Sequence, residues 1–159
     1  MSYNIEGYYN GIPSYKSNCH CYKSSYNYII LKNKKIITGI KWECIEFIRR
    51  YLSITYNITF DFVENVYDIL NLKYFVDFYK IKPIFFDLYK KSSNFSPKID
   101  DLALFYYKNT GHIAIVSKIR DHKHIEICEQ NWEKPWENSE YSRVINIKDP
   151  KIIGFLRFL

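Results

Sequence analysis

The segment from Lys41 to Arg50 carries the clearest helical pattern of hydrophobic and polar positions in the chain. Large apolar side chains follow Cys44 at three, four, seven and eight residues, which is the spacing of one buried helical face. They are Phe47, Ile48, Tyr51 and Leu52. The positions that fall outside this face are Glu46, Arg49 and Arg50. The pattern predicts an amphipathic helix that begins near Cys44, with the cysteine facing inward, and ends near Ser53.

Weaker patterns predict the elements on either side of this helix. Residues 26–31 have the composition of a short strand, and residues 32–35 follow as a turn. A second helical pattern begins near Phe62. Its apolar positions are Val63, Val66, Tyr67, Ile69 and Leu70. Residues 74–88 are dense in aromatic side chains and interrupted by Pro83, so their pattern leaves both helix and strand open.

The second half of the chain has the pattern of a sheet, in which apolar runs of strand length alternate with turn signals. The predicted strands are residues 102–107, 112–118, 124–130, 143–147 and 152–159. Helices first and an antiparallel sheet afterwards form an α+β layout. Residues 1–25 are rich in Tyr, Asn, Ser and Gly and contain a Gly11–Pro13 turn, so we predict an irregular N-terminal arm lying over the body.

Composition is that of a soluble globular protein of one domain. The chain has 159 residues, of which 47% are apolar and 25% charged, and its 16 Tyr and 11 Phe predict a largely aromatic core. The net charge of +6 comes from basic residues spread over several turns without a nucleic-acid-binding motif, so we expect neither a nucleic acid nor a membrane as partner. The N-terminus lacks a secretion leader and no run of 18 apolar residues occurs, which favours a cytoplasmic protein. The sequence leaves the oligomeric state open.

The cysteines are expected to be reduced thiols, because the chain carries no secretion signal. Cys19, His20 and Cys21 could be combined with His122 and His124 into a metal site. Zinc motifs do not use two such one-residue spacings, however, so we expect neither a metal nor a cofactor.

Cys44 is the candidate for chemistry. The N–H groups at the start of a helix stabilise negative charge and therefore favour a thiolate, and Gly39 lets the chain bend just before the helix. The other interpretation is a buried cysteine that packs as a small hydrophobe. A thiol nucleophile also needs a base, and a third group that orients the base.

Residues in two predicted strands can supply the base and the group that orients it. His112 opens a strand directly after Gly111, and Glu129 and Asn131 share one face of the next predicted strand, within reach of an imidazole across a strand spacing of roughly 5 Å. The alternation predicts Ala114 and Val116 on the face of His112, Ile113 and Ile115 on the opposite face, and Ile125 and Ile127 on the face of Glu129. Taken singly, His112 can also be a turn histidine, and Glu129 can pair with a surface lysine.

Three blocks of the sequence resemble the signature blocks of the CHAP (cysteine, histidine-dependent amidohydrolase/peptidase) amidases. They are Trp-Glu-Cys-Ile-Glu-Phe-Ile-Arg-Arg at residues 42–50, Gly-His-Ile-Ala-Ile-Val at residues 111–116 and Glu-Gln-Asn at residues 129–131. Within this family the blocks are similar to those of the amidase domain of bifunctional glutathionylspermidine synthetase/amidase and of its trypanothione counterpart. The resemblance spans nearly the whole chain. It implies a papain-like fold of one domain, residues 1–159, with N-terminal helices that carry the cysteine packed on an antiparallel sheet that carries the histidine and the glutamate.

The resemblance also implies a role for each polar residue of the blocks. Cys44 would be the nucleophile, His112 the general base and then acid, and Glu129 the orienting carboxylate. Arg49 and Asn131 would bind the substrate, Arg49 by its glutathione half. Arg50 points about 100° further round the helix and would be ordinary surface.

The reaction implied is hydrolysis, through a cysteine thioester, of the amide in a glutathione–polyamine conjugate such as glutathionylspermidine. The chain stops at Leu159, so no synthetase domain is expected and only hydrolysis would be inherited. A CHAP peptidoglycan amidase or endopeptidase and a non-catalytic interaction domain of the same fold are the alternatives. The chain departs from the family pattern at two positions. Glu43 precedes the cysteine where the family has a glutamine, and Asp100 stands where a glycine is common in the family.

Overall fold

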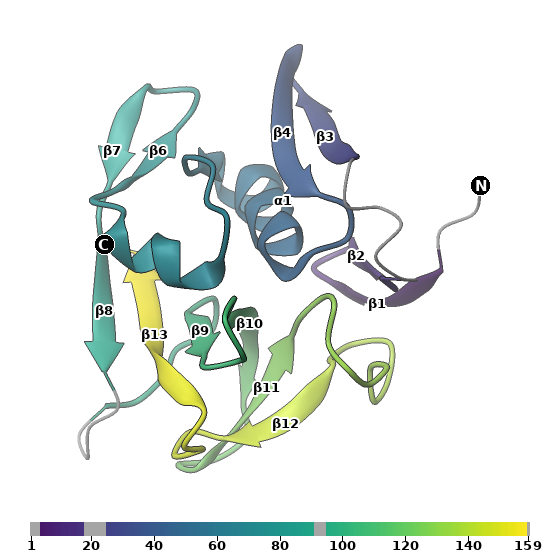
Figure 1. The fold of residues 1–159 in the computed structure, drawn as a ribbon, viewed down its shortest axis with the longest axis vertical. Helices are drawn as coiled ribbons and strands as arrows, with labels where there is room; N and C mark the ends of the chain where they lie inside the picture. Colours follow the sequence, from purple (N-terminus) through teal and green to yellow (C-terminus); the bar gives the residue numbers. More distant parts are fainter. Residues whose placement is uncertain (1–3, 18–24, 91–94, 159) are drawn as a thin grey trace.

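The computed structural model describes residues 4–17, 25–90 and 95–158. Its central element is α1 (Cys44–Tyr56), which lies between a six-stranded sheet and a set of smaller hairpins (Figure 1). The helix begins at the predicted residue and runs slightly beyond the predicted end at Ser53. Asn57 closes it in the left-handed conformation, with φ of 60°, and donates its N–H to the carbonyls of Leu52 and Ser53.

The six-stranded sheet is antiparallel, in the spatial order β12-β11-β10-β9-β13-β8. Its strands are β8 (Phe86–Lys90), β9 (Leu102–Phe105), β10 (His112–Ile119), β11 (His124–Cys128), β12 (Arg143–Asn146) and β13 (Ile152–Phe158). The antiparallel sheet predicted for the second half of the chain is therefore confirmed. The layout of helices before the sheet is met only in part, since β1 to β4 all precede α1 and, of these four, only the strand at residues 26–31 was predicted.

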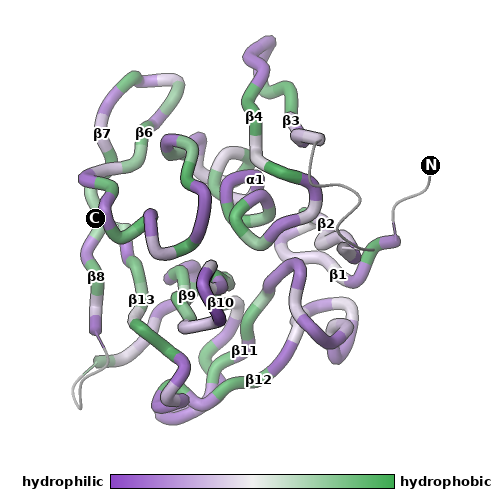
Figure 2. Tube along the Cα trace, in the orientation of Figure 1, coloured by the Kyte–Doolittle hydropathy of each residue, from purple (hydrophilic) through white to green (hydrophobic). Residues whose placement is uncertain are grey.

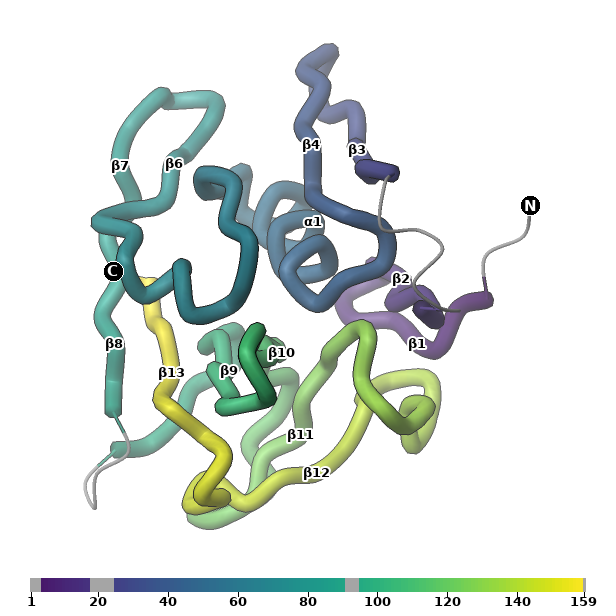
Figure 3. The backbone as a smooth tube through the Cα atoms, in the orientation of Figure 1, coloured from purple at the N-terminus to yellow at the C-terminus, as the bar shows by residue number. Residues whose placement is uncertain are grey.

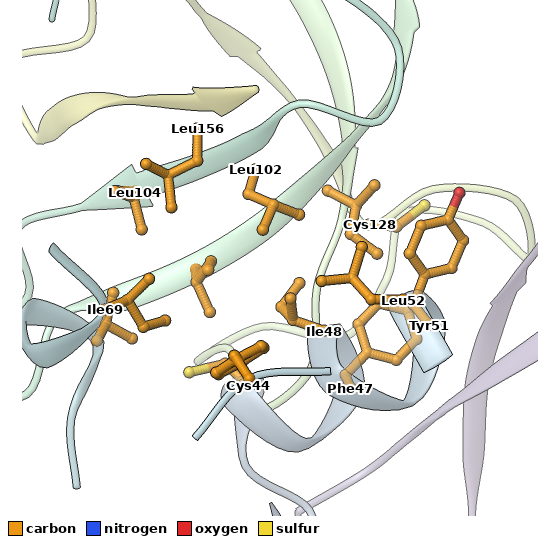
Figure 4. Close-up of a cluster of buried hydrophobic side chains, with 14 of the residues drawn as sticks. Cys44, Phe47, Ile48, Tyr51, Leu52, Ile69, Leu102, Leu104, Cys128 and Leu156 are labelled. Carbon is orange, nitrogen blue, oxygen red and sulfur yellow. The ribbon is translucent and has the colours of Figure 1, made fainter. Parts of the chain in front are cut away.

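Alternation along β10 divides the core into two clusters, as predicted. Ile113 and Ile115 face α1, whereas Ala114 and Val116 lie in a second cluster on the opposite face of the sheet. Figure 4 shows Ile48 of α1 on the side of the helix that faces Leu102 and Leu104 of the sheet, with Cys44 at the edge of the same cluster. The side chains on the apolar face of the helix, Phe47, Ile48, Tyr51 and Leu52, are all fully buried.

The polar face of α1 is buried as well, which the hydrophobic pattern did not predict. Glu46, Arg49 and Arg50 are 0%, 4% and 3% exposed, so the expectation that Arg50 is ordinary surface is wrong. The reason is that hairpins from the N-terminal part of the chain cover this side of the helix and supply polar partners. Thr38 and Pro13, for example, each accept a hydrogen bond from one of the two arginines through their backbone carbonyls.

The N-terminal arm, predicted to be irregular, instead contains a hairpin of β1 (Ile5–Tyr9) and β2 (Ile12–Tyr15). Asn10 and Gly11 form its two-residue turn, both with positive φ, at 48° and 76°. An Asn-Gly pair is the strongest short-range hairpin signal, and it places the turn one residue before the predicted turn at Gly11–Pro13. The hairpin buries Ile12 and Ser14 against the body.

The remaining strands form two small sheets. They are β3 (Tyr26–Leu31) paired with β4 (Lys34–Ile40), and β5 (Ile58–Thr59), β6 (Phe75–Asp77) and β7 (Lys82–Ile84) in one sheet. The predicted strand at residues 26–31 is confirmed, and the ambiguous region 74–88 consists of strands and turns. Figure 2 shows the hydrophobic residues along β4 and the hydrophilic tip of its hairpin.

The second helical pattern produces a 3₁₀ helix, η2 (Val66–Asn71), where a longer helix was expected from Phe62 onward. A 3₁₀ helix has three residues per turn, so Val66 and Ile69 lie on one face and both are buried. Asn65 and Asp68 cap its start reciprocally. Neither helix in the described part of the chain is both long and apolar enough to cross a membrane.

Asp100, at the position where the resemblance implies a glycine, has a left-handed backbone with φ of 71°. Its carboxylate accepts hydrogen bonds from the hydroxyl groups of Tyr9 (2.8 Å), Tyr51 (2.6 Å) and Tyr56. An aspartate tolerates this conformation better than most residues, and the three tyrosines tie the turn before β9 to the helix and to β1. The turn therefore keeps its shape without the glycine.

Candidate active site

A cleft of about 580 Å³ opens beside the N-terminus of α1. Its walls are the end of β4, the first turns of α1, the segment before η2 and the turn between β9 and β10. Figure 3 follows the chain from α1 through this segment to η2, beside the start of β10. The polar residues lining the cleft are Ser17, Glu43, Cys44, Glu46, Arg49, Glu64, Asn65, Tyr107, Thr110, His112 and Asn131.

Cys44 is the first residue of α1 and is 8% exposed, at the floor of the cleft. The residue before it, Glu43, has an extended backbone, and its side chain makes no capping hydrogen bond to the helix. The positive end of the helix dipole is therefore not screened by a side-chain cap. Gly39, with φ of 140°, passes so close that a Cβ there would lie 3.3 Å from the Cα of Glu46.

His112 and Glu129 form a buried pair. His112 Nε2 lies 2.8 Å from Glu129 Oε2, and the two residues are 3% and 0% exposed. Gly111 has φ of 68°, and a Cβ there would lie only 3.0 Å from Val66, so a glycine is needed for the chain to enter β10 at this point. The structure thus brings together Glu129 and His112 across neighbouring strands, and His112 and Cys44 in one cleft.

Burial and charge act against each other on this pair. Burial alone would lower the pKa of His112, but interactions with Cys44 and Glu129 raise it to about 9. Burial would raise the pKa of Glu129, but His112 and Arg143 lower it to about 2. An imidazolium beside a carboxylate is therefore the favoured state near neutral pH, and the positive charge lies next to the thiol.

Arg143 and Ser142 are two partners of Glu129 that the sequence did not reveal. Arg143 donates from Nε to Oε1 at 2.7 Å and from Nη2 to Oε2 at 3.2 Å, and Ser142 Oγ donates to Oε1 at 2.6 Å. Arg143 pairs with Ile127 in the register of β11 and β12, so a long side chain can reach Glu129 two residues on. This register was the signal that could have found it, but only once the two predicted strands were aligned.

Gln130 is a third residue that sequence reasoning missed. It is fully buried, and its Nε2 donates to the carbonyl of Glu43 at 3.0 Å and to Glu46 Oε2 at 2.9 Å. Its Oε1 accepts from Tyr15 N at 2.9 Å and from Arg50 Nη2 at 3.2 Å. The amide ties the end of β11 to the start of α1, and so fixes the distance between the two halves of the site.

Aromatic rings cover His112 on its outer side. The ring of Trp132 lies 4.9 Å from that of His112, and the guanidinium of Arg143 lies 4.0 Å from the centre of the Trp132 ring. Phe105 contacts the imidazole from β9, with ring centres 6.0 Å apart. These contacts limit the access of water to the hydrogen bond between His112 and Glu129.

Arg49 and Arg50 differ in how fully they are bonded. Arg50 donates to Glu46 from Nε (2.9 Å) and Nη2 (3.2 Å), and to the carbonyl of Pro13 from Nη1 (2.7 Å). Arg49 donates to the carbonyls of Thr38 (2.8 Å) and Asp61 (3.0 Å), but its buried Nε has no partner in the described part of the chain. Burial lowers the pKa of Arg49 to about 10. Arg49 lines the cleft, and Arg50 is not among the lining residues.

Asn131 and Glu43 meet at the mouth of the cleft. Asn131, whose backbone is left-handed with φ of 60°, donates from Nδ2 to Glu43 Oε2 at 2.7 Å. This contact joins the end of β11 to the N-cap of α1. The acid that departs from the family pattern is therefore held by a neutral amide.

The candidate metal ligands do not form a site in the described chain. Cys19, His20 and Cys21 lie outside the residues that the structure describes. Among residues 4–17, 25–90 and 95–158, no group of three His, Cys, Asp or Glu side chains could hold a metal ion. His124 instead contacts the carboxylate of Asp121 at 3.0 Å on an exposed turn.

Comparison with known proteins identifies the family of the chain. The chain is 29% identical over 97 residues to the bifunctional glutathionylspermidine synthetase/amidases of Escherichia coli (strain K12) and of Shigella flexneri. Each match covers 58% of this chain and 16% of the relative, so the chain corresponds to a small part of those proteins. The model of the CHAP domain matches residues 7–131. The chain therefore belongs to the CHAP domain family, whose members are generally amidohydrolases or peptidases.

Proposed function

We propose that this CHAP domain is a cysteine amidase with Cys44 as nucleophile, His112 as general base and acid, and Glu129 as the carboxylate that orients the imidazole. The observation that carries the proposal is the meeting of Cys44 and His112 in one cleft, with Glu129 bonded to Nε2 of the histidine. Because Nε2 is committed to Glu129, Nδ1 is the nitrogen left to face the thiol. A thiol nucleophile requires a base that is oriented in this way by a third group.

The reaction would follow in two steps. His112 takes the proton of the Cys44 thiol as the sulfur attacks the amide carbonyl. It then donates a proton to the departing amine, which leaves a thioester. His112 then takes a proton from a water molecule, and the resulting hydroxide attacks the thioester. This attack releases the free carboxylic acid and restores the thiol. The N–H of Cys44, at the uncapped start of α1, would donate a hydrogen bond to the oxyanion in both steps.

The substrate we propose is a glutathione–polyamine conjugate such as glutathionylspermidine, cleaved to glutathione and spermidine. The relatives named for this chemistry motivate the choice, and Arg49 supports it. Its guanidinium lines the cleft and carries a positive charge, which suits a carbonyl or carboxylate of the glutathione half. Asn131, at the cleft mouth, would contact the same substrate.

Release of free amine from glutathionylspermidine by the purified protein tests the proposal. A peptidoglycan fragment in a parallel reaction tests the competing CHAP substrate. We expect turnover of the first and loss of turnover in Cys44→Ala, and His112→Ala should be nearly as damaging, because members of a catalytic unit are not additive. Undiminished turnover in Cys44→Ala would eliminate the mechanism, and cleavage of only the peptidoglycan fragment would eliminate the substrate.

Cys128 provides a matched control for the role of the thiol. It is a second buried free cysteine, and burial raises its pKa to about 12, so it should remain a thiol near neutral pH. Iodoacetamide should therefore label Cys44 faster than Cys128 at pH 7. Cys128→Ala should keep turnover, since Cys128 packs in the core and does not line the cleft.

A further inference from the structure

Glu43, which is partly buried, differs from the fully buried acids of the protein. Each of the buried acids pairs with a cation: Glu46, Asp77, Asp101, Glu126 and Glu129. Glu43 lines the cleft, and no ion pair in the described part of the chain includes it. Its one side-chain partner there is the neutral amide of Asn131. The protein has a net charge of +6, and yet among the described residues this carboxylate of the cleft has no ion pair.

Cys44 lies between this carboxylate and a cation. Arg49 follows Cys44 by five residues, or roughly 7.5 Å along the axis of α1, whereas Glu43 precedes it. Arg49 lines the cleft, and its guanidinium brings a positive charge to this end. One end of the cleft therefore favours an acceptor or an anion, and the other end favours a cation.

We infer that Glu43 selects substrates whose leaving amine carries a positive charge. With the scissile carbonyl at Cys44 and the acyl half toward Arg49, the leaving amine extends past His112 to Glu43 and Asn131. Asn131 occupies Oε2 of the carboxylate and leaves Oε1 for an ammonium group of the amine. The inference rests on the proposed function and adds to it a residue that sets specificity, at the position where this chain differs from the glutamine of its family.

A binding experiment separates this role from catalysis. The ligands share one acyl group: glutathionylspermidine, which is cationic, and the n-butylamide of glutathione, whose amine half is neutral. Calorimetry would measure Kd for both with the Cys44→Ala protein, which cannot turn them over, and with Cys44→Ala carrying Glu43→Gln. The glutamine keeps the size of the side chain and its contact with Asn131, so the fold should be preserved.

We expect Glu43→Gln to reduce the preference for the cationic ligand, expressed as the ratio of the two Kd values, by roughly fivefold. The preference should also fall with added salt when Glu43 is present, and respond less when it is glutamine. Glu137→Gln is the matched control, because it removes the same charge from an exposed position that does not line the cleft. That variant should keep the preference.

Two failures can be told apart. An unchanged ratio in Glu43→Gln, or an equal loss in Glu137→Gln, overturns the role of Glu43 and leaves the proposed amidase standing. Failure of both conjugates to bind, with no release of amine by the wild-type protein, overturns the proposed substrate and this inference together.

Discussion

The two faces of α1 are equally buried but are held by different forces. Toward the sheet, Phe47, Ile48 and Leu52 pack among leucines and isoleucines, where burial of apolar area supplies the stabilisation. Toward the hairpins, Glu46 and Arg50 form an ion pair at 2.9 Å inside a network of hydrogen bonds. Such a network stabilises only while each member is paired, because an unpaired buried charge is costly. The contrast shows that an amphipathic pattern identifies the apolar face of a helix but does not say whether water covers the other face.

Breaking the polar face should have the largest effect on stability. Glu46 accepts hydrogen bonds from Asn27, Thr38, Gln130 and Arg50, so Glu46→Ala leaves a buried guanidinium without its counter-charge. We expect the free energy of unfolding to fall by about 3–5 kcal/mol. Urea denaturation measures it.

Glu126→Ala is the control for the loss of an acid paired with an arginine. Glu126 pairs with Arg120 at 2.8 Å, but the arginine side chain is 42% exposed and regains water when the acid is removed. This variant should lose much less stability than Glu46→Ala. Similar losses in the two variants would contradict the distinction between a buried network and a surface pair.

Breaking the apolar face should cost somewhat less. Leu52 is fully buried between α1 and the sheet, and Leu52→Ala leaves a cavity that the neighbours can only partly fill. We expect a loss of about 3 kcal/mol, also by urea denaturation. Ile54→Ala, on the same helix at 42% exposure, should cost far less, and an equal cost would mean that burial does not set the difference.

The same contrast explains how much of this arrangement could be predicted from the sequence. Local signals were sufficient for the cysteine helix and for the strands of the second half of the chain, but Glu129 lies just beyond the end of β11 at Cys128. They were insufficient for contacts between distant segments. Gln130 and Arg143 act through partners far away in the chain or on a neighbouring strand, and nothing in their local pattern distinguishes them from surface residues. The covering of Arg50 likewise depends on a hairpin predicted to be irregular.

Titration tests the buried pair of His112 and Glu129. The pKa of His112 is raised from its ordinary value of 6.5 to about 9, so protonated His112 stabilises the fold fully below about pH 6.5, and this contribution is lost as pH rises through 9. We expect the free energy of unfolding to drop between pH 7 and 9.5 by a few kcal/mol at most in the wild type, and by less in His112→Gln. An equal drop in both proteins would contradict the assignment.

The smallest expected effect divides the polar face of α1 itself. Arg50 is fully engaged with protein partners and does not line the cleft, whereas Arg49 lines the cleft and brings a positive charge there. Arg49→Ala should therefore lower kcat/KM by an amount equivalent to about 1.5–3 kcal/mol, the range for a hydrogen bond to a charged group. Arg50→Ala should act mainly on stability, and its kcat/KM should change little when measured under conditions where the variant is folded.

Arg49→Lys decides whether the shape of the guanidinium matters as well as its charge. An ammonium keeps the charge but cannot hold the carbonyls of Thr38 and Asp61 as the two ends of the guanidinium do, so it should restore kcat/KM only in part. The matched Arg50→Lys variant controls for the general effect of shortening an arginine on this helix. Equal values of kcat/KM for Arg49→Ala and Arg50→Ala would remove Arg49 from the substrate site, and would leave both arginines as parts of the buried network that holds Cys44 at the start of its helix.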